Sequence, residues 1–221
     1  MARAIDDPAA DLRRRARRAQ GAELKAIARA WWRDHELGRV PVGSCRRIAA
    51  GLIDDSPALA IAVLQQLGEQ LRVADLPLLA RVAATDPRAI ARLLALMLAR
   101  DGGRAELAHA IADWRDAPTS AQRCAACGAL ASLAPRGDAA FAGFTALALS
   151  LCATIVWSHA DDDQAAVGAL LGKLAAAAPA HVDGFVRRYA RLMSRPCARL
   201  AVAKLPARDE LLAHHRRATS I

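Results

Sequence analysis

The sequence predicts an all-α protein built from stacked helical hairpins, and three observations favour this fold class. The composition is 54% hydrophobic but only 4% aromatic, so a core must be filled mainly by Leu, Ile, Val and Ala, of which Ala is the best helix former. Runs of β-branched residues between turn signals, which would indicate strands, are nearly absent. Helix-start signals recur along the chain, and the connections between helical segments are short. The 221 residues suffice to bury a sizeable core.

Helix starts are marked most clearly where a capping residue precedes a proline. This pattern occurs at Asp7-Pro8, Ser56-Pro57 and Asp86-Pro87. A capping oxygen accepts hydrogen bonds from the free N–H groups of the first turn, and proline loses nothing at that position. Further starts are predicted at Gly21 (segment 23–32), Ser44 (45–52), Asp75 (76–84), Gly103, Ser120, Asp138, Asp161 to Asp163, Pro179, Ser194 and Arg208.

Apolar residues recur at helical spacing in the segments that follow these starts. The clearest faces are Leu59, Val63, Leu64, Leu67 and Leu71; Ile90, Leu93, Leu94, Met97 and Leu98; Val167, Leu170, Leu171 and Leu174; and Val182, Phe185, Val186, Tyr189 and Met193. Short loops make consecutive helices antiparallel neighbours. We therefore expect one domain over residues 1–221, a HEAT- or armadillo-like helical-repeat solenoid of about six antiparallel helix pairs. A compact helical bundle is the alternative architecture.

The net charge of +9 comes almost entirely from arginine, since Lys25, Lys173 and Lys204 are the only lysines. A GC-rich genome favours arginine codons, but a guanidinium group also binds phosphate oxygens in pairs, and composition leaves both explanations open. Two arginine clusters are dense enough to contact nucleic acid, although such runs are usually solvated. They are Arg13, Arg14, Arg15, Arg17 and Arg18, and Arg187, Arg188, Arg191, Arg195 and Arg199. On a curved solenoid the two clusters would line one concave face.

The cysteines and the apolar segments indicate a cytoplasmic protein with reduced thiols. The chain has five scattered cysteines: Cys45, Cys124, Cys127, Cys152 and Cys197. Cys124-Ala-Ala-Cys127 has no second pair at zinc-site spacing and lies in an Ala-rich helix, so it is interpreted as small residues on a buried face. Neither a signal peptide nor a membrane-spanning run is recognisable, and residues 141–157 are expected to form a buried helix.

Other residues that suggest chemistry have simpler explanations, so neither a metal site nor a cofactor is predicted. His214 and His215 are adjacent and therefore do not share a helix face, which favours a solvated basic tail over a metal site. The run Asp161–Asp163 is explained by the favourable interaction of carboxylates with a helix N-terminus. The tryptophans are expected to anchor the core; they are Trp31, Trp32, Trp114 and Trp157.

Three segments carry a resemblance to a known family. Ile111-Ala-Asp-Trp114 followed by Gln122-Arg-Cys-Ala-Ala126 is similar to a "W … xRRAA" helix start. Ala166-Val-Gly-Ala-Leu-Leu171, through Pro179, resembles an "AIGWxLREYAxxxP" repeat, and Ser194 with the segment 199–205 resembles a closing "LSxREAxKxL" helix. These are motifs of the DNA alkylation repair family, the AlkD-like HEAT-repeat glycosylases, and the resemblance extends from about Leu71 to Leu205.

The resemblance implies binding of duplex DNA in a concave basic groove and excision of positively charged alkylated purines. The family's cleft combines an Asp, two Trp and an Arg that holds a backbone phosphate. Arg123 matches that Arg, and the second Trp falls at Ala169. The first Trp and the Asp fall in the segment 85–92, which has no Trp and has Asp86 as its only carboxylate. Without aromatic faces to stabilise a developing sugar cation, most of the catalytic stabilisation is lost.

We therefore expect a DNA-binding member of this family without the ordinary glycosylase activity, a monomer that binds duplex or branched DNA and contacts no membrane. The residues expected to contact the DNA backbone are Arg14, Arg17, Arg123, Arg187, Arg188, Arg191, Arg195, Arg199 and Lys204. Two alternatives stay open. One is a working glycosylase with Asp86 as its catalytic carboxylate, and the other is a protein-binding helical scaffold whose charge reflects genomic bias.

Overall fold

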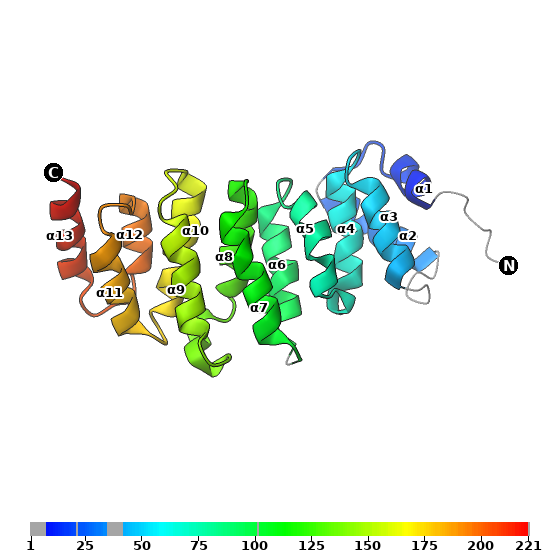
Figure 1. Ribbon diagram of the computed structural model, residues 1–221. Coiled ribbons are helices and arrows are strands. Elements are labelled where there is room, and N and C mark those ends of the chain that lie inside the picture. The colour runs from blue at the N-terminus through cyan, green and yellow to red at the C-terminus, as the bar shows by residue number, and fades with distance from the viewer. Residues whose placement is uncertain (1–7, 21, 35–41, 101, 221) are drawn as a thin grey trace. The chain divides into compact units, whose positions relative to one another are not determined.

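The computed structural model describes residues 8–20, 22–34, 42–100 and 102–220, and these residues form helices and turns without a strand (Figure 1). The predicted all-α class is therefore confirmed. The helices are α1 (Pro8–Arg15), α2 (Ala22–Asp34), α3 (Val42–Leu52), α4 (Pro57–Leu67), α5 (Leu76–Val82), α6 (Pro87–Leu98), α7 (Arg104–Ala112), α8 (Ser120–Leu130), α9 (Phe144–Ile155), α10 (Asp161–Leu174), α11 (Pro179–Tyr189), α12 (Arg195–Ala201) and α13 (Arg208–Thr219).

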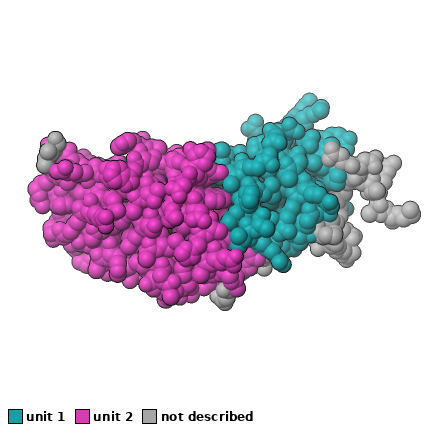
Figure 2. Space-filling view, viewed as in Figure 1, with its two compact units in different colours: residues 1–90 teal, residues 91–221 magenta. Residues whose placement is uncertain are grey.

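Contacts within the chain group the residues into two compact units, 1–90 and 91–221 (Figure 2). The boundary falls inside α6, so unit 1 holds α1 to α5 and unit 2 holds most of α6 together with α7 to α13. The organisation as a single domain over residues 1–221 and the number of helix pairs stay predictions.

Most of the predicted helix starts are confirmed. Helices begin as expected at Pro8, Pro57, Leu76, Pro87, Arg104, Ser120, Asp161, Pro179, Arg195 and Arg208. At α12 the cap is seen directly, because Ser194 Oγ accepts a hydrogen bond from Cys197 N at 3.2 Å. The start of α3 at Val42 lies ahead of the predicted segment 45–52, and the start signals at Asp7 and Gly21 lie outside the described residues.

The helix predicted to start at Asp138 begins later, at Phe144, and this prediction was wrong about position. A 3-10 turn occupies Ala134–Ala139, and Gly137 within it has a φ of 51°, which residues with a Cβ rarely adopt. Asp138 still caps α9, since its Oδ1 accepts a hydrogen bond from Thr145 N at 2.7 Å. The Asp138 carboxylate therefore caps the first turn of α9 from the other side of the intervening loop.

Unit 2 is built from the hairpins α7/α8, α9/α10 and α11/α12, which follow one another side by side, with α13 after them (Figure 1). α10 packs against α8 on one side and α12 on the other, while α7 contacts α9 and α11 contacts α13. The predicted apolar face of α10, Val167, Leu170, Leu171 and Leu174, is buried. This repetition of stacked hairpins confirms the helical-repeat solenoid.

Two glycines on α10 let α12 approach closely. A Cβ at Gly168 would lie 2.7 Å from Cys197 O, and one at Gly172 would meet Leu200 O more closely still. The two glycines are four residues apart and therefore lie one above the other on the same helix face. Because neither glycine has a side chain, the backbones of α10 and α12 can lie in contact at these two positions.

A buried glutamine joins two turns at one end of these hairpins. Gln164 Nε2 lies within hydrogen-bonding distance of three carbonyl oxygens, Val156 O at 2.9 Å, Ser158 O at 2.8 Å and Leu192 O at 3.1 Å, which share its two N–H groups. Its Oε1 accepts a hydrogen bond from Ser194 N at 2.8 Å. The turn between α9 and α10 is therefore fastened to the turn that precedes α12.

The prediction that the tryptophans anchor the core holds for Trp31 but not for Trp157. Trp31 is fully buried, and its Nε1 donates to Asp11 Oδ2 at 2.9 Å, as suits a core anchor. Trp157 is 64% exposed, so its placement in the core was wrong. The expected buried helix in 141–157 ends at Ile155, which leaves Trp157 in the following turn. No helix in the described part of the chain is both long and apolar enough to cross a membrane.

Candidate nucleic-acid interface

Arg123 lies in the first turn of α8 and is held by the protein itself. Its Nε and Nη2 donate to Asp163 Oδ2 at 3.1 and 2.7 Å, and its Nη1 donates to Ala117 O at 2.6 Å. Only 19% of the side chain is exposed. The guanidinium therefore already has a carboxylate partner, and its contact with a DNA phosphate stays a prediction.

The carboxylate that holds Arg123 is completely buried. Asp163 Oδ1 accepts a hydrogen bond from Ser120 Oγ at 2.8 Å, and Cys124 Sγ lies 3.8 Å from the same oxygen. Burial by itself would raise the pKa of Asp163, but hydrogen bonds from Arg123, Ser158 and Ser120 and the charge of Arg123 outweigh it. The pKa therefore lies below its ordinary value. A charged Asp163 thus joins the start of α8 to α10.

The exposed side of α10 offers no aromatic surface. Ala165 and Ala169 are exposed on this helix, followed by Lys173 one turn later. Ala169 is the position at which the resemblance places the family's second cleft tryptophan. A methyl group has no π face with which to stack on a base or attract a cation. This exposed face of α10 therefore carries Asp161 at its start, alanines in its middle and Lys173 near its end.

Three exposed arginines line an open depression on α12 and at the start of α13. Arg195, Arg199 and Arg208 form it with Pro196 and Leu200, and its volume is about 610 Å³. Within the part of the chain that the structure describes, no acidic side chain forms an ion pair with any of the three. We call Arg195, Arg199 and Arg208 the α12 basic surface. Its guanidinium groups are free to bind an external anion.

Arg187 differs from the α12 basic surface because it is paired within the protein. Its Nε donates to Asp183 Oδ1 at 2.6 Å, and its Nη2 donates to Glu210 Oε1 at 2.8 Å. Hydrogen bonds to Asp183 and Glu210 raise the pKa of Arg187 above its ordinary value. The side chain therefore links α11 to α13, and its predicted contact with DNA would have to compete with these carboxylates.

The other predicted cations near the C-terminus lie on α11 and in the turns on either side of α12. Arg188 Cζ lies 5.4 Å from the centre of the Tyr189 ring, within range of a cation–π interaction. Arg191 and Lys204 are exposed in the turns before and after α12. All three are accessible, and their contacts with DNA stay predictions.

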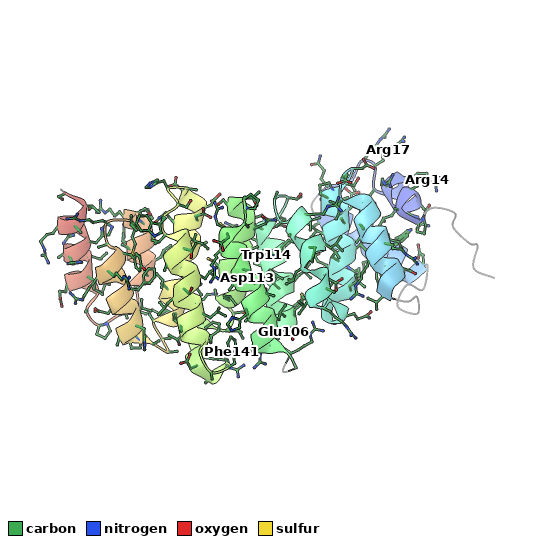
Figure 3. All side chains as sticks on the ribbon, viewed as in Figure 1. Arg14, Arg17, Glu106, Asp113, Trp114 and Phe141 are labelled. Carbon is green, nitrogen blue, oxygen red and sulfur yellow. The ribbon has the colours of Figure 1, made fainter. Side chains whose placement is uncertain are left out.

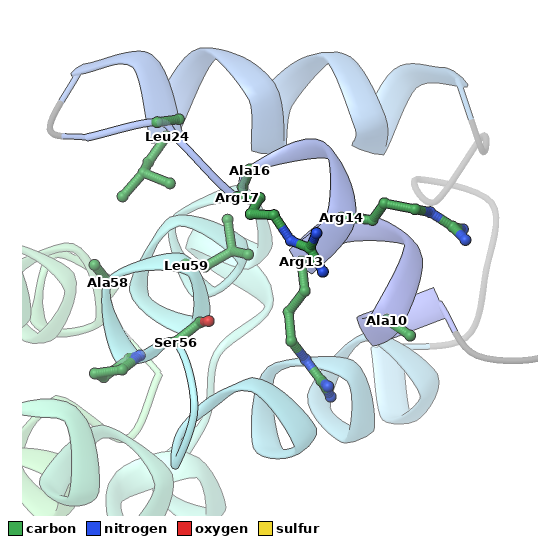
Figure 4. A pocket seen from close by; sticks show the side chains of 11 residues that line it. Ala10, Arg13, Arg14, Ala16, Arg17, Leu24, Ser56, Ala58 and Leu59 are labelled. Atoms are coloured by element: carbon green, nitrogen blue, oxygen red, sulfur yellow. The ribbon is translucent and has the colours of Figure 1, made fainter.

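In unit 1, the predicted contacts Arg14 and Arg17 lie on α1 and just after it (Figure 3). Arg14 Nη2 donates to Asp11 Oδ1 at 2.9 Å, whereas Arg17 is exposed. Both arginines line a pocket of about 670 Å³ between α1 and the start of α4 (Figure 4). The N-terminal arginine cluster thus forms part of a pocket within unit 1.

Asp86, the candidate catalytic carboxylate, caps α6. Its Oδ1 accepts a hydrogen bond from Ala89 N at 2.9 Å, which is the bond expected of a helix cap. The segment 85–92 around it contains no aromatic residue. The structure thus gives this carboxylate a local role, and its catalytic role stays a prediction.

The thiols of unit 2 are free and poorly suited to chemistry. Cys127, Cys152 and Cys197 are buried, and burial raises their pKa values, that of Cys197 to about 12. Protonated thiols are weak nucleophiles and weak metal ligands. Among the described residues, no group of three or more His, Cys, Asp or Glu side chains is placed to hold a metal ion.

The structure buries several polar side chains, among them two that the sequence pattern placed elsewhere, Asp163 and His215. Asp163 was grouped with its exposed neighbours as a residue that favours the helix N-terminus, and His215 was assigned to a solvated tail. That assignment of His215 was wrong, since its side chain is buried and its Nε2 lies 2.8 Å from Met193 O. Helical spacing would have found both, because Asp163 shares a face with Val167 and His215 shares one with Leu211. Both of these apolar partners are buried.

A comparison with sequence models of protein families gives a match over most of the chain. The family described as DNA alkylation repair enzyme matches residues 18–205. This range includes Arg123, Asp163 and the whole of α12. No curated protein and no solved structure matches the chain.

Proposed function

The chain belongs to the family of DNA alkylation repair enzymes, and we propose that it binds the DNA backbone through the α12 basic surface and lacks the family's ordinary glycosylase activity. Membership gives the chain a role in DNA alkylation repair. The observation that carries the proposal is the group of three exposed arginines that have no acidic partner among the described residues. Exposed arginines of this kind bind backbone phosphates and give affinity for DNA without sequence preference.

The distribution of charge within unit 2 supports this assignment. Residues 179–221 contain nine Arg and Lys but only three Asp and Glu. Residues 91–178 contain seven Arg and Lys and eight Asp and Glu. The positive excess of unit 2 therefore belongs entirely to α11, α12, α13 and their connections. A bias toward arginine codons would not by itself concentrate the excess in one segment.

The spacing of the arginines suits a phosphate backbone. Arg195 and Arg199 are four residues apart on α12, and the Cβ atoms of such a pair are about 5–6 Å apart. Two long arginine side chains that start this close together can reach the same phosphate or adjacent ones, each with paired hydrogen bonds. Arg208 adds a third cation from the next helix, so the depression attracts phosphate from two sides.

The absence of ordinary glycosylase activity is inferred from the positions that correspond to the family's cleft. Ala169 presents a methyl group where the family has a tryptophan, and Asp86 is hydrogen-bonded to the backbone of α6. Arg123 is paired with Asp163. Excision of a cationic purine requires stabilisation of a sugar cation by a carboxylate and aromatic faces. The described residues at these positions provide neither aromatic face.

DNA binding is tested by fluorescence anisotropy with a labelled duplex at several salt concentrations. The variant Arg195→Ala/Arg199→Ala should reduce the slope of log affinity against log salt by about 2, because each lost phosphate contact removes about one counterion. The matched control is Arg216→Ala/Arg217→Ala, which removes the same charge from exposed positions of α13 outside the depression. Equal slopes for the two variants, or no binding by the wild type at low salt, would contradict the proposal. A branched duplex in the same titration shows whether the α12 basic surface prefers a junction.

Activity is tested by measuring methylated purine released from alkylated duplex DNA. We expect no release above background from the wild-type protein. Release that depends on Asp86 would overturn this half of the proposal and leave DNA binding intact. The two halves are therefore tested separately.

A further inference from the structure

The pocket in unit 1 has a cationic side and an apolar side. Its volume of about 670 Å³ lies within the range of about 300–1,000 Å³ that is usual for small-molecule sites. Figure 4 shows Leu24 and Leu59 on one side and the side chains of Arg13, Arg14 and Arg17 on the other. A ligand that fills it must therefore combine an anionic group with an apolar one.

Arg17 supplies free donors to the cationic side, and Arg13 adds positive charge beside it. Arg13 is fixed in place, since its Nη2 donates to Gly51 O at 3.2 Å and its Nη1 lies 3.6 Å from Asp55 Oδ2. Its Nε is buried and has no hydrogen-bond partner within the described part of the chain. Arg17 is exposed, and none of the described residues forms an ion pair or side-chain hydrogen bond with it. Arg14 also lines the pocket, but its guanidinium is paired with Asp11.

The first turn of α4 adds a third source of positive potential. Ser56, Pro57 and Ala58 line the pocket, and Pro57 has no N–H group. Leu59 N and Ala60 N both donate to Ser56 O, at 2.9 and 3.0 Å. The Ser56 side chain does not cap the helix, and among the described residues Ala58 N has no acceptor. The N-terminal end of a helix attracts anions, and here a free N–H group lies in a pocket lined by arginines.

We propose that this pocket binds a phosphomonoester attached to an apolar or aromatic body, such as a nucleoside 5′-phosphate or the phosphorylated end of a DNA strand. The phosphate lies beside Arg17 and the first turn of α4, which supply free donors, and the charge of Arg13 adds to the attraction. The base packs against the apolar lining at Leu24, because Leu59 is already buried within the protein. The proposal does not rest on the α12 basic surface, because every lining residue belongs to unit 1.

The test is calorimetric titration of the full-length protein with deoxyadenosine 5′-monophosphate at low salt. We expect saturable binding that is at least about tenfold tighter than binding of deoxyadenosine, because the nucleoside lacks the charge-assisted contacts. Inorganic phosphate should also bind at least about tenfold more weakly, because it leaves the apolar side empty. Equal affinity for nucleotide and nucleoside, or for nucleotide and inorganic phosphate, would overturn the proposed ligand class.

Two variants test the site itself. Arg17→Ala should weaken nucleotide binding at least about tenfold, whereas Arg18→Ala, an exposed arginine that does not line the pocket, should leave it unchanged. Ala58→Glu places a carboxylate in the pocket and should abolish binding. A carboxylate in the first turn stabilises a helix, so thermal unfolding should show that α4 is intact. Binding by Ala58→Glu at the wild-type level, or equal losses in the two arginine variants, would refute the site.

The source of the phosphate is distinguished with short single strands that carry a 5′-phosphate or a 5′-hydroxyl. Internal phosphates are the same in both strands, so any difference in affinity reports the terminal phosphate. Tighter binding of the phosphorylated strand identifies a strand end as the ligand, and equal binding beside saturable nucleotide binding identifies a free nucleotide. The variant Arg195→Ala/Arg199→Ala should keep nucleotide binding, so failure of the DNA-backbone proposal would be recognised separately.

Discussion

Arg123 and Arg199 lie on two helices that both pack against α10, yet their side chains are in opposite situations. Arg123 is 19% exposed and bonded to the buried carboxylate of Asp163. Arg199 is exposed and has no acidic partner among the described residues. A match to a family motif drew attention to Arg123, while the free donors needed to bind phosphate are on Arg199. The partner that the protein itself supplies decides whether an arginine is available to a ligand.

The contrast between Arg123 and Arg199 is tested most strongly by removing Asp163, the buried partner of Arg123. Asp163→Ala leaves the guanidinium of Arg123 partly buried without a carboxylate, which should lower the free energy of unfolding by about 3–5 kcal/mol. Chemical denaturation measures the change. Arg195→Ala, on the α12 basic surface, should change it by less than about 0.5 kcal/mol. Equal small effects would show that the Arg123–Asp163 pair behaves as a surface pair.

The pH dependence of stability sharpens the same contrast. The pKa of Asp163 is lowered from its model-compound value of 3.8 in the folded protein, so its charged form stabilises the fold above the unfolded-state pKa. This contribution is lost as the pH falls through the folded-state pKa. The difference in unfolding free energy between the wild type and Asp163→Asn should therefore be constant from neutral pH to about pH 5 and shrink below about pH 4. A difference that persists unchanged to lower pH would show that the carboxylate charge is not its source.

Gly172 lies on α10, the helix that carries Asp163 and against which α12 also packs. It therefore connects the Arg123–Asp163 pair with the α12 basic surface. Gly172→Ala places a methyl group against Leu200 O and should destabilise the protein by about 1–3 kcal/mol, despite the better helix propensity of alanine. Gly184→Ala on α11 is the matched control. A Cβ there would meet nothing within 4 Å, so only propensity acts and the protein should gain up to about 1 kcal/mol. Stabilisation by both variants would show that α12 moves aside at little cost.

The smallest effect is expected at Asp86. Asparagine caps helices about as well as aspartate, so Asp86→Asn should change the unfolding free energy by less than about 0.5 kcal/mol, whereas Asp86→Ala should cost about 1 kcal/mol. Thermal or chemical unfolding measures both. This ordering would identify Asp86 as a cap, and a larger loss in Asp86→Asn than in Asp86→Ala would contradict it.

The helices were predictable where their signals are local. Proline at the first helical position located the starts of α4, α6 and α11, because the reason for it lies within one turn of chain. Asp138 failed as a start because its partner, Thr145 N, lies beyond a turn that depends on Gly137. Gly172 carried no local signal, since its function depends on the carbonyl of Leu200 in another helix.

The candidate site was predictable only in part for the same reason. Arg123 was found through a motif, but Asp163, which decides its availability, is 40 residues away in sequence. Arg208 was recognised only as the beginning of a helix. It joins Arg195 and Arg199 because the chain folds back after α12, which arginine spacing alone does not reveal.

The hydrogen bonds of Gln164 have a mechanical consequence for unit 2. The Gln164 side chain bonds both to the turn after α9 and to the turn before α12, so these turns cannot separate without breaking its contacts with one of them, either those to Val156 O and Ser158 O or those with Leu192 O and Ser194 N. The hairpins α9/α10 and α11/α12 are therefore stiff at this end. Any bending of unit 2 as it follows the curvature of a partner must be absorbed at the opposite ends of these helices, where α10 leads into α11 and α12 into α13. The flexibility of unit 2 is thus confined to the end of the hairpins that lies opposite Gln164.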